Sequence, residues 1–192
     1  YPSGAKTKYK NNVLAIKLLK QIELEKRTAT PEEQIILARY VGWGGLANAF
    51  SSTASGWENE YQELKSLLTD VEYKAAMNST ITAYYTEPDL IRHIYRALER
   101  FGFEGGPDRK ILDPGMGTGN FYSVLPEQFQ GSKLFGVELD SITGRIAKQL
   151  YQNANISITG FENTTYPDNF FDVVVGNVPF GDYKVFDPKY NK

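Results

Sequence analysis

The segment whose residues are best suited to carry out a chemical reaction covers residues 170–183, FFDVVVGNVPFGDY. Its apolar run ends in Asn177, Val178, Pro179 and Phe180. The Asn side-chain carbonyl and the Val backbone carbonyl can accept both hydrogens of a planar amino group, while the Phe ring can stack on the attached ring. Such an amino group is a poor nucleophile because its lone pair is delocalised, and accepting both hydrogens returns electron density to nitrogen. We therefore predict that these four residues are catalytic in a reaction at an amino nitrogen.

A glycine-rich turn, ILDPGMGTGNF, occupies residues 111–121 after a second apolar run. Glycines allow the backbone to turn sharply and to approach a ligand closely. The acid at the end of the run disfavours a pyrophosphate and attracts an ammonium group, as in the methionine end of S-adenosylmethionine. The predicted cofactor-binding residues here are Asp113, Gly115, Gly117, Gly119, Asn120 and Phe121.

Two further runs end in residues suited to a nucleoside. Glu138 follows one of them and can accept hydrogen bonds from ribose hydroxyls; an acid favoured at a helix N-terminus fits Asp140 better. Phe161 could stack on an adenine ring, or Glu162 could accept from its amino group, and a plain loop at this place is an equal alternative.

These runs alternate with helical periodicity after Thr80, which is typical of βαβ units on a parallel sheet. We expect an α/β fold with four parallel strands in the spatial order 3-2-1-4. The expected strands are 110–113, 133–137, 155–159 and 171–176, with helices at 120–126 and 141–152.

The first eighty residues carry helical patterns and no strand pattern. Apolar spacing predicts a helix over 12–27, after a polar and frayed start, and another over 31–40. A Ser or Thr followed three residues later by Glu marks a helix start. This pattern occurs at Thr30, Ser55 and Thr69. A further helix is expected over 89–101.

Composition excludes several kinds of site. The chain has no cysteine and a single histidine, His93, so disulfides, cysteine-rich zinc sites and methylation through a cysteine nucleophile are excluded. No apolar run approaches the roughly 18 residues that a membrane helix needs.

Residues 1–30 carry a net charge of +5 and the remainder −7. The basic start could contact phosphates or could be the solvated face of a helix, and most DNA contacts should lie elsewhere in the parent protein.

These motifs resemble the class I S-adenosylmethionine-dependent amino-methyltransferases, which have a Rossmann-like fold and an (Asn/Asp)-Pro-Pro-(Tyr/Phe) motif. Tyr84-Tyr85-Thr86-Glu87-Pro88 is similar to the Tyr/Phe-Thr-Pro segment of adenine methyltransferases. The resemblance implies that Tyr85 and Thr86 also bind the cofactor, and that the glycine turn, Glu138 and Phe161 or Glu162 bind the methionine, ribose and adenine parts respectively.

The segments TPEEQIILARYVGWGGL and GVELDSITGRIAKQLY narrow the resemblance to the methylase region of large methylase–helicase fusions of bacterial mobile elements and phages. This implies a cytoplasmic enzyme that methylates the adenine amino group in DNA, with a helicase region in the same polypeptide. A protein glutamine-amide methyltransferase is one alternative, and an idle scaffold that positions DNA or a partner is another.

The chain departs from that family in two ways. Val178 replaces the usual first proline, which removes a fixed φ. The chain begins at Tyr1 and ends soon after the fourth strand, whereas the family's sheet has seven strands. We therefore expect a helical region over 1–80 and a partial methyltransferase domain over 81–192. Alone, it should bind the cofactor weakly, leave DNA unmethylated, and self-associate through the exposed edge of strand four.

Overall fold

The computed structural model describes residues 4–81 and 86–178. The chain forms two compact units. The first comprises the described part of 1–84 together with 140–152, and the second comprises the described part of 85–192 without that insertion.

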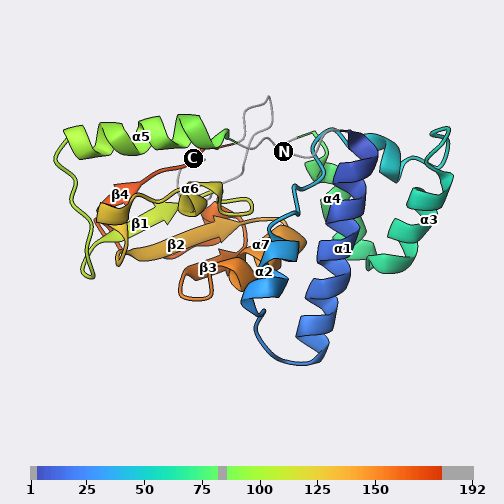
Figure 1. The fold of residues 1–192 in the computed structure, drawn as a ribbon, viewed down its shortest axis with the longest axis horizontal. Coiled ribbons are helices and arrows are strands. Elements are labelled where there is room, and N and C mark those ends of the chain that lie inside the picture. The colour runs from blue at the N-terminus through green and yellow to red at the C-terminus, as the bar shows by residue number, and fades with distance from the viewer. Residues whose placement is uncertain (1–3, 82–85, 179–192) are drawn as a thin grey trace, which may run out of the picture. The chain divides into compact units, whose positions relative to one another are not determined.

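The second unit is built on a parallel sheet whose strands are ordered β3-β2-β1-β4, which confirms the predicted α/β fold and strand order (Figure 1). Leu112 in the middle of β1 lies opposite Phe135 of β2 on one side and Val174 of β4 on the other. Because all pairings are parallel, the carboxyl ends of the strands meet at one edge. The strands are β1 (Lys110–Asp113), β2 (Lys133–Glu138), β3 (Asn155–Ile158) and β4 (Val173–Val174).

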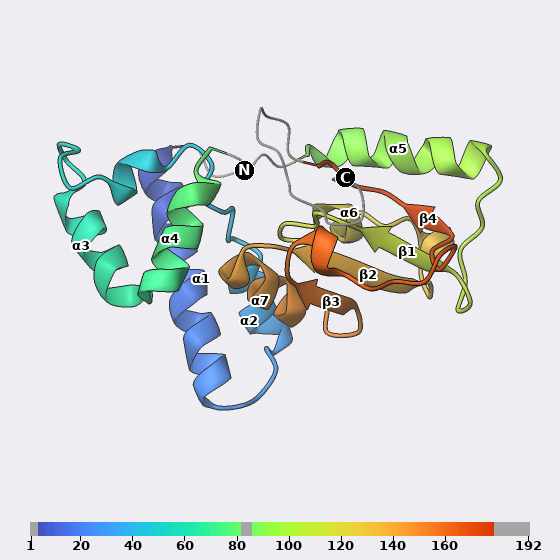
Figure 2. The same ribbon diagram turned by 180° about the vertical axis from the view of Figure 1, so that it is seen from behind.

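Helix α5 (Pro88–Arg100) and the short α6 (Asn120–Ser123) lie on the same side of this sheet in both views (Figures 1 and 2). Proline in the first turn of α5 has a φ suited to a helix start, so the helix begins close to the predicted residue. Its buried face carries Tyr95, whose ring meets Phe121 and Phe129 edge-on. The glycine turn therefore leads into a helix that is fixed by aromatic packing.

Residues 159–172 connect β3 to β4 with a 3₁₀ turn, Phe161–Asn163, and without an α-helix. Four half-buried aromatic rings pack edge-on or stacked in and beside this connection: Phe135, Tyr166, Phe170 and Phe171. They supply apolar contacts where a crossover helix is usual.

Strand β4 is shorter than the sequence predicts. Its ladder with β1 covers Val173 and Val174, rather than 171–176. Val173 and Val175 are buried while Val174 is 61% exposed, so one face of this strand is covered and the other is exposed.

The first unit is helical and contains α1 (Ala5–Leu24), α2 (Pro31–Leu37), α3 (Glu58–Leu67) and α4 (Asp70–Ser79). Helix α7 (Ser141–Leu150), which follows β2 along the chain, belongs to this unit. Ile16, Trp43, Leu64 and Ile146 are fully buried members of one apolar cluster. Among the described residues, no helix has the length and apolarity needed to cross a membrane.

Helix α1 begins at Ala5, well before the predicted residue 12. The prediction failed because Tyr9 lies in a polar stretch but is 2% exposed, and its hydroxyl donates to the Glu60 carbonyl at 2.9 Å. Long-range contacts thus stabilise the first turns of the helix.

Two of the three predicted capping boxes are confirmed, at Thr30 and Thr69, where each side chain accepts from the backbone of a Glu three residues later. Ser55 does not cap α3, which corrects the prediction. The chain turns at Gly56, with φ +76°, and Trp57 becomes the residue before the helix. The Glu58 carboxylate instead accepts from the Gly56 N–H at 3.1 Å.

Much of the positive charge of residues 1–30 is used inside the helical unit. Four of its seven basic side chains form ion pairs with Glu side chains. This favours the interpretation of a helix surface over that of a phosphate-binding segment. The pairs are Lys6–Glu60, Lys17–Glu63, Lys20–Glu72 and Arg27–Glu33.

Candidate cofactor and acceptor site

Asp113 ends β1 and is the most buried acid of the predicted site, with 1% exposure. Its Oδ1 accepts from the Gly115 N–H at 3.2 Å. Burial raises the pKa of the carboxyl to about 7, the Gly115 hydrogen bond opposes this rise, and the neighbouring Glu138 carboxylate adds to it. An ammonium group beside this carboxylate would compensate its lost hydration.

The glycine turn takes its shape from left-handed backbone at Gly117 (φ +54°) and Gly119 (φ +86°), where a side chain would be strained. Gly117 also donates its N–H to Glu138 Oε2 at 2.8 Å. A Cβ on Gly115 would meet nothing within 4 Å, so this part of the turn borders open space. The structure therefore brings together Asp113, the turn and Glu138, as the sequence predicts.

Tyr122 is a supporting residue outside the set predicted from the sequence. Its hydroxyl donates to the backbone carbonyls of Ile111 and Phe135, in β1 and β2 respectively. The side chain is buried, and burial raises its pKa, so the phenol stays protonated as a donor. The sequence shows that Tyr122 follows the glycine turn, which marks it as close to the site. It does not reveal that the hydroxyl bonds to two neighbouring strands.

Thr86 lies beside the start of α6, because its carbonyl accepts from the Asn120 side chain at 3.4 Å. The Thr86 hydroxyl is buried and has no hydrogen-bond partner among the described residues. Phe121 is 3% exposed and its ring packs on Tyr95, so its ring supports the turn through the apolar core. Tyr85 lies outside the described residues.

Phe161 and Glu162 lie in the 3₁₀ turn after β3 and are both exposed. Phe161 is 49% exposed, which leaves a ring face open to stacking. Glu162 Oε1 accepts a hydrogen bond from the Asn163 side chain at 3.2 Å. The Glu162 carboxylate occupies the space that a side chain on Gly160 would need. Both alternatives for contacting an adenine ring therefore remain predictions.

Asn177 and Val178 follow β4 at the carboxyl edge of the sheet and are exposed. Just before them, the Val175 N–H donates to the Leu112 carbonyl at 2.8 Å, which extends the contact between β4 and β1. Asn177 is thus two residues from a backbone bond to the strand that ends in Asp113. Pro179 and Phe180 lie outside the described residues.

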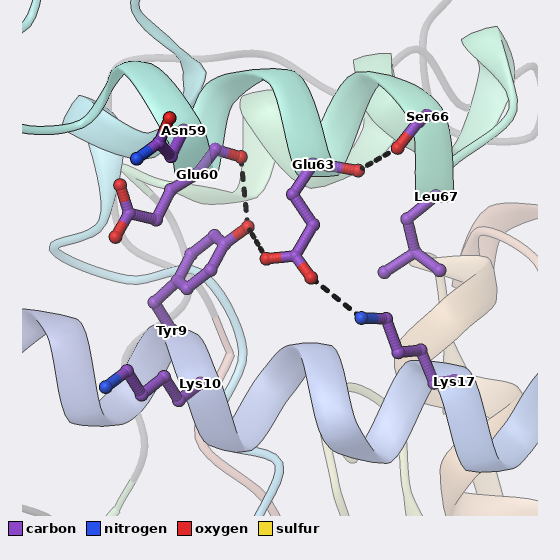
Figure 3. Close-up of a pocket in the computed structure, with 8 residues that line it drawn as sticks. All are labelled: Tyr9, Lys10, Lys17, Asn59, Glu60, Glu63, Ser66 and Leu67. Carbon is purple, nitrogen blue, oxygen red and sulfur yellow. Dashed lines mark hydrogen bonds and ion pairs between the residues drawn. The ribbon is translucent and has the colours of Figure 1, made fainter.

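A groove of about 600 Å³ lies elsewhere, between α1 and α3 of the helical unit (Figure 3). Tyr9 donates to Glu63 at 2.9 Å and Lys17 donates to the same carboxylate at 2.7 Å, so these polar groups satisfy one another. None of the predicted site residues that the structure describes lines this groove. In the part of the chain that the structure describes, no cluster of three His, Asp or Glu side chains could hold a metal ion.

Comparison with known proteins gives a match between residues 112–180 and a family described as a methyltransferase domain. The "Defense against restriction protein B" of Escherichia phage P1 is 28% identical over 172 residues, which are 88% of this chain and 6% of that protein. The "Modification methylase CviBIII" of Paramecium bursaria Chlorella virus NC1A is 33% identical over 78 residues, 41% of this chain and 21% of that protein. The chain thus spans a small part of the length of both relatives.

A solved structure, the methyltransferase subunit of a type I restriction-modification system from Streptococcus thermophilus, aligns with 88% of this chain and 44% of its own. The two are 16% identical with a TM-score of 0.41.

S-Adenosylmethionine is the cofactor that the matched family indicates for the sheet and glycine turn. The described residues fit this molecule. The buried Asp113 carboxylate suits its ammonium group, and the Thr86 hydroxyl, which has no partner in the described part of the chain, suits a further polar group. Glu138, half-buried at the end of β2, suits a ribose hydroxyl.

Proposed function

We propose that this chain is the cofactor-binding part of a DNA methyltransferase that acts on the exocyclic amino group of adenine. The observation that carries the proposal is the contact between β4 and β1 at the carboxyl edge. It holds Asn177, a candidate acceptor-site residue, next to the strand that ends in Asp113, a candidate donor-site residue. A transfer reaction needs its donor and acceptor sites close together.

When bound, S-adenosylmethionine supplies a methyl group on a sulfonium sulfur, and the carbon–sulfur bond breaks as the carbon–nitrogen bond forms. The chain's own groups prepare the nitrogen. The Asn177 side-chain carbonyl accepts one amino hydrogen and the Val178 backbone carbonyl accepts the other, which favours a pyramidal nitrogen with an available lone pair. The proton lost from nitrogen passes to solvent.

The choice of DNA as substrate is supported by the names of two relatives, which refer to modification methylation and to defence against restriction. The choice of adenine rests on the sequence motif that begins at Asn177 and on the Tyr84–Pro88 segment. The match to 6% of a phage protein supports a place in a much longer polypeptide, such as a methylase–helicase fusion. DNA and a helicase region of the same polypeptide are accordingly the proposed partners.

The test measures methyl transfer to plasmid DNA by the complete polypeptide, with mapping of the modified base. Asn177→Ala should lower the transfer rate by about 100-fold or more, because a preorganised group in contact with the reacting nitrogen is lost. Cofactor affinity should stay within about twofold, since Asn177 acts on the acceptor. Asn155→Ala is a matched control, because that Asn is exposed at the amino end of β3.

Transfer to a glutamine-containing peptide in place of DNA would contradict the proposed substrate. Retention of full activity by Asn177→Ala would contradict the proposed role of this residue.

A further inference from the structure

We propose that Gly176 is a positioning residue for the donor carboxylate. The missing side chain at residue 176 lets Asp113 Oδ1 hold the glycine turn in the shape that receives the donor. This inference rests on the proposed function and adds to it a residue outside the predicted site.

Asp113 and Pro114 occupy the space that a side chain at residue 176 would need. A Cβ on Gly176 would lie 2.6 Å from Asp113 Oδ1 and 3.2 Å from Pro114 Cδ. Favourable contacts between such atoms lie near 3.5–4.0 Å, so an alanine cannot occupy this place without a shift. Gly176 is not among the glycines with positive φ. The glycine is therefore needed for space and not for an unusual backbone conformation.

The carboxylate has little freedom to move away. Asp113 is 1% exposed, and the oxygen that a Cβ would strike is the one that accepts from the Gly115 N–H. Displacing it breaks this bond and releases the start of the glycine turn. The alternative movement, of residue 176 away from β1, is opposed by the adjacent backbone bond from Val175 to Leu112.

The close approach of Gly176 to Asp113 connects the candidate acceptor site with the candidate donor site. Gly176 directly precedes Asn177, and Asp113 directly precedes the turn for the donor. A change at residue 176 is therefore expected to affect the donor mainly through Asp113 Oδ1, the atom that a Cβ would approach most closely, and a double-mutant cycle with Asp113 tests this inference.

The experiment measures S-adenosylmethionine affinity by calorimetry on the complete polypeptide, for wild type, Gly176→Ala, Asp113→Ala and the double variant. Gly176→Ala should weaken binding by about tenfold. In the Asp113→Ala background the same substitution should change affinity by less than about twofold, because the carboxylate that it displaces is absent. Val174→Ala in the same strand should leave affinity unchanged, since that side chain points outward and is 61% exposed.

Unchanged affinity in Gly176→Ala, or equal losses in both backgrounds, would overturn the inference while leaving the proposed function standing. A wild-type polypeptide that does not bind the cofactor would instead overturn the proposed function, and this inference with it. If Gly176→Ala lowers folding stability, Asp113→Ala should restore the melting temperature in the double variant, because it removes the atom in the way. Failure of that rescue would also contradict the inference.

Discussion

At the scale of single residues, the site is organised around a carboxylate placed where it is costly to ionise. Asp113 loses almost all its hydration and accepts a backbone hydrogen bond from Gly115. Its pKa of about 7 follows from burial first, with the Glu138 charge adding to it. Functional sites commonly retain such unfavourable groups because a ligand supplies the missing interaction.

This pKa predicts how cofactor affinity depends on pH. The ionised carboxylate binds an ammonium group better than the neutral acid does, so affinity should rise between about pH 5.5 and 7.5. Above that range an α-amino group, with a pKa of roughly 7.7–8.0, begins to lose its own proton. Calorimetry across this window should show the rise for wild type and a flat profile for Asp113→Asn. An equal slope in both proteins would assign the titration to another group.

The same group predicts a change in stability. Its folded pKa lies above the unfolded value of about 3.9, so between about pH 4 and 7 the folded chain holds a proton that the unfolded chain has released. The free energy of unfolding therefore falls through this window, and the cost is fully present above about pH 7. Asp113→Asn should raise the free energy of unfolding by roughly 1–2 kcal/mol at pH 8, and by little at pH 4. Urea denaturation at the two pH values is the measurement; a decrease at pH 8 would contradict this prediction.

The sequence identified Asp113 and Glu138 because acids at the ends of strands, beside a glycine turn, are typical of folds that bind nucleosides. It did not identify Tyr122 and Gly176, although both lie close to predicted residues. Their roles depend on what lies across the sheet: two carbonyls for Tyr122 and one carboxylate oxygen for Gly176. Linear spacing carries no information about such contacts.

At the scale of elements, α7 shows how tertiary contacts decide where a helix belongs. Arg145 of α7 pairs with Glu23 of α1 and Glu72 of α4, both at 2.7 Å. Burial alone would raise the pKa of Glu72, but hydrogen bonds from Arg145, the Thr69 backbone and Lys20 outweigh it and lower the pKa to about 2. The alternation of strands and helices predicted α7 well. It did not reveal these partners, because they come from residues far away in the chain.

We predict that Arg145→Met destabilises the helical unit by about 3 kcal/mol, because it leaves Glu72, whose side chain is 8% exposed, with one cation fewer. Arg92→Met is the control. Its pair with Asp89 spans three residues on an exposed helix face, so its loss should cost less than about 0.5 kcal/mol. Chemical denaturation of both variants provides the comparison. Similar losses would mean that the α7 ion pairs contribute no more than surface pairs.

At the scale of the whole molecule, β4 lies at one edge of the described sheet although its sequence is as apolar as that of an interior strand. β4 pairs with β1, and in the described residues no strand pairs with its other side. Val174 is 61% exposed, and the Phe170 and Phe171 rings beside it are half-buried. An apolar strand edge with unpaired N–H and C=O groups favours pairing with another strand.

The last prediction is that the 192-residue chain by itself self-associates through this edge. Sedimentation velocity over a range of concentrations should show a shift from monomer to dimer or larger species. Val174→Lys should suppress the shift, because a charge on an edge strand opposes pairing of strands from two chains. Leu24→Lys places the same charge on a side chain that is 83% exposed at the end of α1, so it should leave the association unchanged. A monomer at every concentration, or an equal effect of the two lysines, would show that the edge of β4 does not drive association.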